Sequence, residues 1–260
     1  MKKNNFVKLL ATILVAIFFC GKAYSANEDL IKMNWSFGGI TGKFERDSLQ
    51  RGYQVYKEVC ASCHSMQYLS YRNLSQKGGP EFTLGEVKAI AASYEVEDGP
   101  NSDGDMYTRP ARPSDHFVNP YQNVNAAIAS NGGAYPPDMS VLVKARPGGA
   151  SYIYSVLMGY EEKPAEFELE DGVYYNKYMD GNKIKMPSPL SDDLIEYTDG
   201  TSATQAQMAK DVTAFLAWAA EPHLEARHRT GTKVIIYLIL LATLVYFSMK
   251  KIWSRVDAEK

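Results

Sequence analysis

The sequence predicts a mainly α-helical protein with extensive irregular loops and one C-terminal transmembrane helix. Three observations predict this class: a few clear helical patterns, long stretches rich in Pro, Gly, Asn and Asp over 98–149 and 160–201, and an uncharged apolar run near the C-terminus. A domain with so much irregular chain and so few periodic segments needs another source of cohesion. A large buried cofactor would supply it.

The clearest amphipathic pattern covers residues 44–59. Leu49, Tyr53 and Tyr56 recur at intervals of four and three, which places them on one face of a helix. The pattern runs directly into Cys60, so this helix is expected to present whatever chemistry the cysteine carries.

Two capping boxes predict the starts of two further helices. They are Thr83-Leu-Gly-Glu86 and Ser202-Ala-Thr-Gln205, and the second helix is expected to end near Pro222. Apolar residues then line one face of each helix: Val87, Ile90, Ala91 and Tyr94 after the first box, and Val212, Phe215, Leu216 and Ala219 after the second.

Residues 1–25 have the layout of a secretory signal peptide. Three lysines precede an apolar run from Leu9 to Cys20, and Ala23-Tyr24-Ser25 places small residues at the usual cleavage positions. The apolar run is short for an uncleaved anchor, because spanning about 30 Å of hydrocarbon takes roughly 20 apolar residues. We therefore expect cleavage after Ser25 and export of the chain that follows.

Residues 234–249 form an uncharged run without a polar face, unlike a helix buried in a globular core. Lys233 is able to snorkel, so the run is long enough to cross a bilayer. Basic residues flank both ends, so the orientation is predicted from the leader. The expected organisation is a signal peptide over 1–25, an exported domain over 26–229, a transmembrane helix over 230–250 and a cytoplasmic tail over 251–260.

The exported part is acidic, although the whole chain is nearly neutral. Residues 26–226 hold 17 basic and 28 acidic side chains, a net charge of −11, and much of the excess lies in two runs, 95–105 and 161–171. Such a field disfavours nucleic acid and would steer a basic protein partner. Solvated loops that only keep the domain soluble fit the same pattern equally well.

The stretch VCASCHS holds Cys60 and Cys63, the only cysteines left after the leader. A disulfide between them would close a tiny ring, and a zinc site would need about four ligands. A thioredoxin-like redox pair expects a βα context. The spacing C-x-x-C-H instead indicates covalent attachment of haem c, in which each thiol adds to a vinyl group and His64 binds the iron. The sequence therefore predicts a c-type cytochrome domain around one covalent haem.

The other axial position has several candidates. They are His116, His223, His228 and the methionines, of which Met186 lies in the proline-flanked segment KIKMPSPL. Prolines favour extended backbone, so Met186 could be presented rigidly to the iron. The residues alone leave this choice open. An open axial position would instead suit a haem enzyme, which rapid carbon monoxide binding by the reduced protein would reveal.

A series of blocks occurs in a characteristic order along the mature chain. They are WSFGGITGKFERDSLQRGYQVYKEVCASCHSM, ARPSDHFVNPY, NGGAYPPDMS, KARPGGASYIYSVLMGY, GNKIKMPSPL and DVTAFLAWAAEPHLEARHRTG, followed by a hydrophobic helix. In this order they resemble the cytochrome c1 family, and the resemblance covers essentially the whole mature chain. It implies the haem subunit of ubiquinol–cytochrome c reductase, the cytochrome bc1 complex, of bacterial type.

The resemblance also implies the residues that hold the haem. Cys60 and Cys63 match the thioether positions, His64 the proximal ligand and Met186 the axial methionine. With His/Met ligation the iron has no open position, and methionine raises its reduction potential.

Four further residues match the surroundings of the haem. Arg146 and Tyr152 match residues placed against a haem propionate, and a guanidinium offers paired donors to such a carboxylate. Asn131 and Pro137 match a loop along the haem edge. Some family members carry an extra disulfide in the exported domain, for which this chain has no cysteine left.

The function implied by the resemblance is one-electron transfer in a respiratory chain, without a substrate-converting site of its own. The expected donor is the Rieske iron–sulfur protein and the expected acceptor a c-type cytochrome, which the acidic runs predict to be basic. Cytochrome b is the expected neighbour in the membrane. The expected location is a bacterial inner membrane, crossed once, with the haem domain on the periplasmic side.

Overall fold

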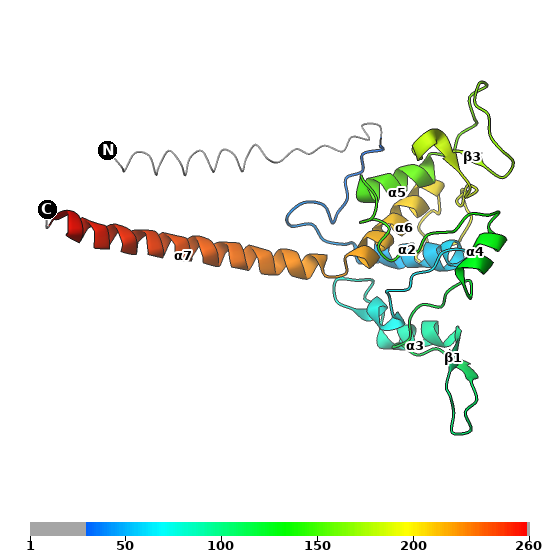
Figure 1. The fold of residues 1–260 in the computed structure, drawn as a ribbon, viewed down its shortest axis with the longest axis horizontal. Coiled ribbons are helices and arrows are strands. Elements are labelled where there is room, and N and C mark those ends of the chain that lie inside the picture. The colour runs from blue at the N-terminus through cyan, green and yellow to red at the C-terminus, as the bar shows by residue number, and fades with distance from the viewer. Residues whose placement is uncertain (1–29, 259–260) are drawn as a thin grey trace.

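The computed structural model describes residues 30–258, so the predicted signal peptide over 1–25 lies outside the described residues. Figure 1 shows a globular part that contains α2 to α6 and one long helix, α7, that projects away from it. The strands within 30–258 form two small two-stranded sheets, and the remaining regular structure is helical. The mainly helical class with one long apolar C-terminal helix is therefore confirmed.

Helices α2 (Arg46–Glu58) and α6 (Gln205–Ala220) pack together at the centre of the globular part. They approach closely at Gly52, where a Cβ atom would lie 2.1 Å from the carbonyl oxygen of Asp211. Only glycine permits this crossing.

The helix predicted over residues 44–59 is confirmed by α2. Aromatic rings fill the core around the crossing: Tyr53, Tyr56, Phe117, Phe215 and Trp218.

A buried carboxylate joins these two helices. Asp211 is fully buried and accepts hydrogen bonds from Ser48 Oγ at 2.6 Å, Arg51 Nε at 2.8 Å and Gln207 Nε2 at 2.8 Å. Arg51 also donates to the exposed Asp199 at 2.8 Å. Because α2 leads directly to the cysteine motif, this network fixes the element that carries the motif.

The predicted capping box at Ser202 is wrong in register. The N-cap of α6 is Thr204, whose Oγ1 accepts a hydrogen bond from the backbone N–H of Gln207 at 3.2 Å. Gln205 is the first helical residue, and its own N–H donates to the carboxylate of Asp192 at 2.7 Å. A distant side chain thus satisfies a free donor at the helix start, so the local box is not needed.

The other predicted capping box is confirmed at the start of α3 (Leu84–Ala92). Thr83 Oγ1 accepts from the N–H of Glu86 at 3.2 Å, and the Glu86 carboxylate accepts from the N–H of Thr83 at 2.8 Å. The helix buries Val87 and Ala91 on the expected face.

Helix α5 (Gly149–Met158) packs against α6 and has no counterpart among the predicted elements. Its sequence shows no clear polar face, because the core surrounds most of its second half: Ile153 to Val156 are all buried. Trp35 fixes the N-terminal segment on it, with Nε1 donating to Ser151 Oγ at 3.1 Å. Periodicity fails as a signal where a helix is buried on more than one face.

The segments predicted as irregular contain several short elements. They are α4 (Val124–Ser130), the strand β2 (Tyr107–Pro110), which pairs antiparallel with β1 (Glu95–Asp98) at the edge of the first segment, the two-residue strands β3 (Tyr174–Tyr175) and β4 (Lys183–Ile184), and the 3₁₀ turn η3 (Asp180–Asn182). Two further 3₁₀ turns, η1 (Cys60–Ser62) and η2 (Tyr71–Ser75), lie before these segments. The rest of these segments is irregular, as expected.

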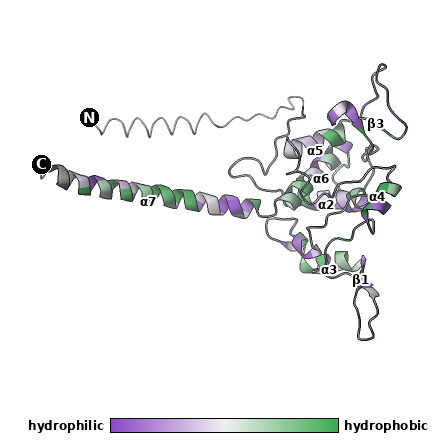
Figure 2. Ribbon diagram, in the orientation of Figure 1, coloured by the Kyte–Doolittle hydropathy of each residue, from purple (hydrophilic) through white to green (hydrophobic). Residues whose placement is uncertain are grey.

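Helix α7 (Leu224–Ala258) is continuous over 35 residues and extends beyond the predicted 230–250 at both ends. Its large apolar side chains between Val234 and Met249 are all 42% to 67% exposed. Figure 2 shows this apolar band along the helix and a hydrophilic stretch next to the globular part. A helix apolar on every side, with no covering from the described chain, suits the interior of a bilayer.

Candidate functional site

The cysteine motif lies on one tight turn after α2. Helix α2 ends at Glu58, and η1 follows, in which the backbone N–H groups of Cys63 and His64 both donate to the carbonyl of Cys60, at 3.1 and 2.9 Å. Both thiols are free. This turn gathers two thiols and an imidazole within five residues, as covalent attachment of one flat macrocycle requires.

The Cys60 thiol is unsuited to dithiol redox chemistry. Burial raises the pKa of Cys60 to about 12, and the neighbouring Cys63 adds to the rise. Reactive C-x-x-C pairs need a lowered thiol pKa, because the thiolate is the nucleophile. The raised pKa of Cys60 therefore argues against a dithiol redox pair.

His64 is held as a neutral imidazole with one nitrogen free. Its side chain is only 9% exposed, and Nδ1 lies 2.8 Å from the carbonyl oxygen of Pro137. A carbonyl only accepts, so Nδ1 carries the proton and Nε2 keeps its lone pair. Burial lowers the pKa of His64, against the opposing effects of the Pro137 carbonyl and the Asp138 charge. A neutral imidazole oriented by a backbone carbonyl is the usual form of a histidine metal ligand.

The carbonyl of Pro137 is itself fixed by Asp138, a residue that the sequence did not single out. The Asp138 carboxylate accepts from Ser65 Oγ at 2.7 Å and from the backbone N–H groups of Gln67 and Ser140, both at 2.9 Å. Burial raises the pKa of Asp138, but these hydrogen bonds outweigh burial and keep the pKa below its ordinary value. The charged carboxylate thus clamps the 136–140 loop onto the cysteine motif.

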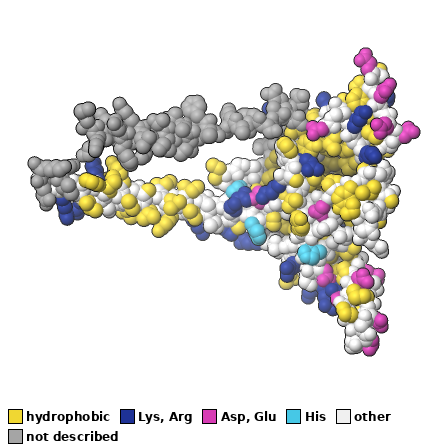
Figure 3. Space-filling model, viewed as in Figure 1, with side chains coloured by type: hydrophobic (Ala, Val, Ile, Leu, Met, Phe, Trp, Pro, Cys, Tyr) yellow, Lys and Arg dark blue, Asp and Glu magenta, His cyan; other side chains and the backbone are white. Residues whose placement is uncertain are grey.

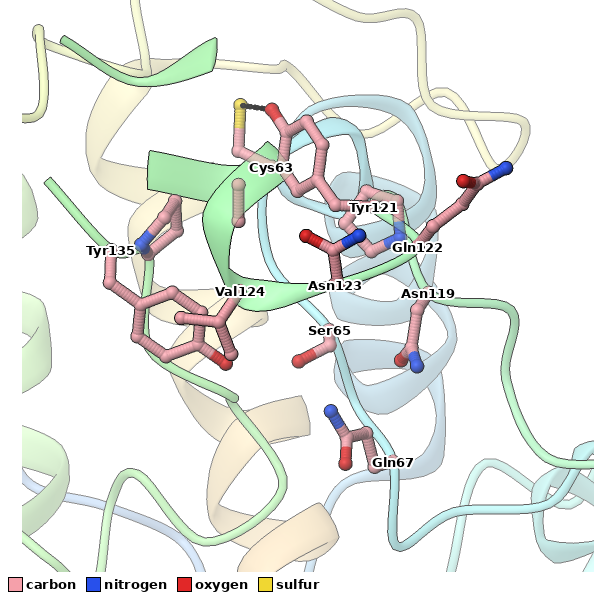
Figure 4. A pocket seen from close by; sticks show the side chains of 12 residues that line it. Cys63, Ser65, Gln67, Asn119, Tyr121, Gln122, Asn123, Val124 and Tyr135 are labelled. Carbon is pink, nitrogen blue, oxygen red and sulfur yellow. Dashed lines mark hydrogen bonds between the residues drawn. The ribbon is translucent and has the colours of Figure 1, made fainter. Parts of the chain in front are cut away.

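Cys63 faces a second loop through Tyr121, which the sequence also did not single out. The Tyr121 hydroxyl donates to Cys63 Sγ at 3.9 Å, and Asn131 Nδ2 donates to the Tyr121 oxygen at 3.1 Å and to the Ala127 carbonyl at 2.7 Å. Figure 4 shows Tyr121 against Cys63 in the wall of a cavity whose other side includes Val124. Pro137 therefore contacts His64 directly, and Asn131 reaches Cys63 through Tyr121; their place along a haem edge stays a prediction.

Met186 lies on a half-buried segment next to the Asn131 loop. The hydroxyl of Tyr160 donates to the Met186 carbonyl at 3.1 Å, and Lys185 Nζ donates to the carbonyl of Gly132 at 3.2 Å. The first bond holds the backbone at Met186, and the second joins the neighbouring Lys185 side chain to the Asn131 loop. Within residues 30–258, no hydrogen bond joins Met186 to the cysteine motif, so its role stays a prediction.

Arg146 and Tyr152 lie close together at the start of α5. Burial raises the pKa of Tyr152, Asp180 adds to the rise, and the positive charge of Arg146 opposes it. The Tyr152 hydroxyl contacts Met179 Sδ at 3.2 Å. Arg146 is exposed and forms no ion pair with a carboxylate in the described part of the chain, so it suits an external anion.

The three histidines outside the motif have different surroundings. His116 is exposed and pairs through its backbone with Ser70. His223 is exposed just before α7, and His228 within α7 contacts the Gly42 carbonyl at 3.2 Å through Nδ1. Among the described residues, none of these three histidines forms a hydrogen bond with the cysteine motif.

The donor set fits a haem: two free thiols, a neutral imidazole with a free nitrogen and, among the described residues, the Arg146 guanidinium without an ion pair, which could bind a carboxylate. Within residues 30–258 no group of three or more His, Cys, Asp and Glu side chains is placed to hold a bare metal ion. Fold and site together define a c-type cytochrome on a single apolar helix.

Comparison with known proteins identifies the family. The model of the Cytochrome C1 family matches residues 35–256. The chain is 45% identical to cytochrome c1 of Rhodospirillum rubrum over 95% of both proteins. It is 46% identical to cytochrome b/c1 of Bradyrhizobium diazoefficiens over 95% of this chain and 40% of that longer protein. A mitochondrial cytochrome c1 heme protein of Arabidopsis thaliana is 46% identical over 87% of this chain and 73% of its own. The chain belongs to the cytochrome c1 family.

Family membership confirms the resemblance that the sequence blocks predicted. It implies a c-type haem and an electron-carrying role. Together with the exposed apolar helix α7, it also indicates a single-pass membrane protein.

Proposed function

We propose that this chain is the haem-bearing electron carrier of a bacterial cytochrome bc1 complex. It takes one electron at a time from the Rieske iron–sulfur protein and passes it to a c-type cytochrome, with cytochrome b as its neighbour in the membrane. The observation that carries the proposal is the Cys60–His64 turn, where burial favours the neutral imidazole and the Pro137 carbonyl accepts from Nδ1, which leaves Nε2 free.

The roles of the residues follow from their chemistry. Cys60 and Cys63 would form the two thioethers that hold the haem, and His64 and Met186 would supply the two ligands of its iron. The haem supplies a single iron that changes its charge by one electron. With both axial positions taken, the chain does no bond chemistry on a substrate, and methionine keeps the reduction potential high.

Four further residues hold the periphery of the haem. Arg146 and Tyr152 bind a propionate, since the guanidinium is exposed and unpaired within the described residues and the phenol lies beside it. Asn131 and Pro137 support one edge, through Tyr121 and through His64 respectively. These contacts keep the site rigid. A rigid site favours electron transfer because the surrounding protein then reorganises little when the charge of the iron changes.

The proposed placement is a bacterial inner membrane with the globular part on the periplasmic side. The leader over 1–25 exports residues 26–229, and α7 crosses the membrane through its apolar band. Residues 251–260 then stay in the cytoplasm.

The proposal is tested by purifying the full chain from its membrane in mild detergent. We expect a denaturing gel to show covalent haem on this chain, and the reduced protein not to bind carbon monoxide, because both axial positions are filled. The Cys60→Ala/Cys63→Ala variant should lose the haem stain completely. Rapid carbon monoxide binding by the wild-type protein would instead identify a haem enzyme with an open position.

The acidic runs lie on two projections of the globular part. The first is on the β1–β2 hairpin and the second is in the loop before β3, and Figure 3 shows acidic side chains at these two ends of the surface, away from α7. Both runs are largely exposed, and few of their carboxylates are paired: Asp98 with Arg109, and Glu161 with Lys177 at 3.9 Å. Their field is therefore available to a partner.

If this field steers the acceptor, electron transfer to a basic cytochrome slows as salt rises. Between about 10 and 150 mM salt the screening length falls from roughly 30 to 8 Å, and we expect a second-order rate constant roughly tenfold lower. Stopped-flow oxidation of the reduced protein measures it, with an acidic cytochrome of similar potential as the control. Equal rates at both salt concentrations would reject steering.

A further inference from the structure

The N-terminal segment forms a closed loop with an exposed isoleucine at its tip. In this Ile40 loop, residues 36–43, the N–H of Lys43 donates to the carbonyl of Ser36 at 3.0 Å and so joins the two ends. Ile40 is 80% exposed, the highest value for any large apolar side chain within residues 30–258. Isolated exposed apolar residues are common, but this one is presented on a turn.

The base of the loop is rigid. The ring of Phe37 stacks on Trp35 at 5.3 Å between centroids and packs on Phe44 at 4.9 Å. A Cβ atom at Gly42 would lie 2.3 Å from the backbone of Phe37, so the two arms touch. Ile40 is therefore held away from the core.

The loop is fastened to the start of α7. The Gly42 carbonyl lies 3.2 Å from Nδ1 of His228, and the N–H of Phe44 donates to the Glu225 carboxylate at 3.0 Å. Figure 1 shows the loop, in blue, projecting from the globular part on the side of α7. The apolar band of α7 begins at Val234, six residues after His228, which is about 9 Å along a helix.

Basic side chains lie near the Ile40 loop and the start of α7. Lys43 in the loop and Arg229 and Lys233 on α7 are all exposed. Figure 3 shows basic side chains and histidines gathered at the base of α7. An apolar tip beside several cations has the composition of a segment that lies at the boundary of an anionic bilayer.

We propose that the Ile40 loop is a second membrane contact, which inserts Ile40 among the lipids of the leaflet nearest the globular part. The occupant of this surface is the bilayer that α7 spans, with its anionic headgroups against Lys43, Arg229 and Lys233. A single helix leaves the globular part free to tilt, and a second contact limits that tilt. The inference depends on the membrane placement of α7 and goes beyond the electron-transfer role.

The test uses the full chain reconstituted into nanodiscs that contain phosphatidylglycerol with a photoreactive diazirine near the start of an acyl chain. After illumination, trypsin releases residues 33–43 as one peptide and residues 89–144 as another, because Arg109 and Arg112 precede prolines and are not cleaved. The second peptide carries the exposed Met106 on the β1–β2 hairpin and serves as the internal control. We expect lipid adducts on 33–43 at several times the level on 89–144.

Substitution at the tip separates lipid contact from chance labelling. Ile40→Asp should reduce the adducts on 33–43 several-fold, whereas Met106→Asp should leave them unchanged. Both positions are exposed, so neither change disturbs the core. Equal labelling of the two wild-type peptides would overturn the proposal. Loss of the lipid adducts on 33–43 when the whole complex replaces the isolated chain would overturn it in favour of a protein interface.

Discussion

The Met186→Leu variant is expected to keep its covalent haem and to show a reduction potential lower by on the order of 0.2–0.4 V. Axial ligands tune haem potentials over roughly 0.8 V, and loss of the thioether removes the ligand that favours the reduced iron. Leucine has nearly the volume of methionine, so packing changes little. A spectroscopic redox titration of the purified protein measures the shift, and a denaturing gel stained for haem checks the attachment.

The structure keeps this test specific to the iron. Backbone hydrogen bonds from Tyr160 to the Met186 carbonyl and from Lys185 to the Gly132 carbonyl do not involve the thioether, so the segment stays in place in the variant. Met106→Leu, on the exposed hairpin, is the matched control and should leave the potential unchanged. If the two variants have the same potential, Met186 is not the ligand.

Sequence reasoning succeeded where chemistry and pattern are local. The C-x-x-C-H turn spans five residues, and α2 carries its apolar stripe on one face only, so both could be read directly. It failed at α5, which is buried on more than one face, and at the start of α6, where Asp192 satisfies a donor from 13 residues away. Those two outcomes depend on tertiary contacts that no local pattern contains.

The same distinction divides the candidate site. Asp138 and Tyr121 contact the cysteine motif from 73 and 58 residues away in the sequence. The residues next to them in the sequence form no motif that would predict this contact. Met186, Arg146 and Tyr152 came from the family resemblance, since the residues alone left the second ligand open. Family membership now supports that resemblance, and the titration above tests its most consequential residue.

A large loss of stability is expected from Asp211→Asn. Asp211 is 0% exposed and accepts from three donors, Ser48, Arg51 and Gln207. Asparagine keeps one acceptor oxygen but turns an NH₂ group toward these donors, and it leaves the charge of Arg51 without its buried partner. Breaking a buried ion pair costs about 3–5 kcal/mol. For a domain of this size we expect a melting temperature lower by roughly 6–20 °C, measured by circular dichroism.

Asp199→Asn is the matched control, because Asp199 bonds the same guanidinium at the same 2.8 Å but is 41% exposed. Water replaces an exposed carboxylate at little cost, so this variant should lose less than about 1 kcal/mol. The difference between the two variants isolates the burial of the charge at the α2–α6 crossing. Similar, small shifts for both would mean that the network does not hold α2, and that the position of the cysteine motif is set by the aromatic core alone.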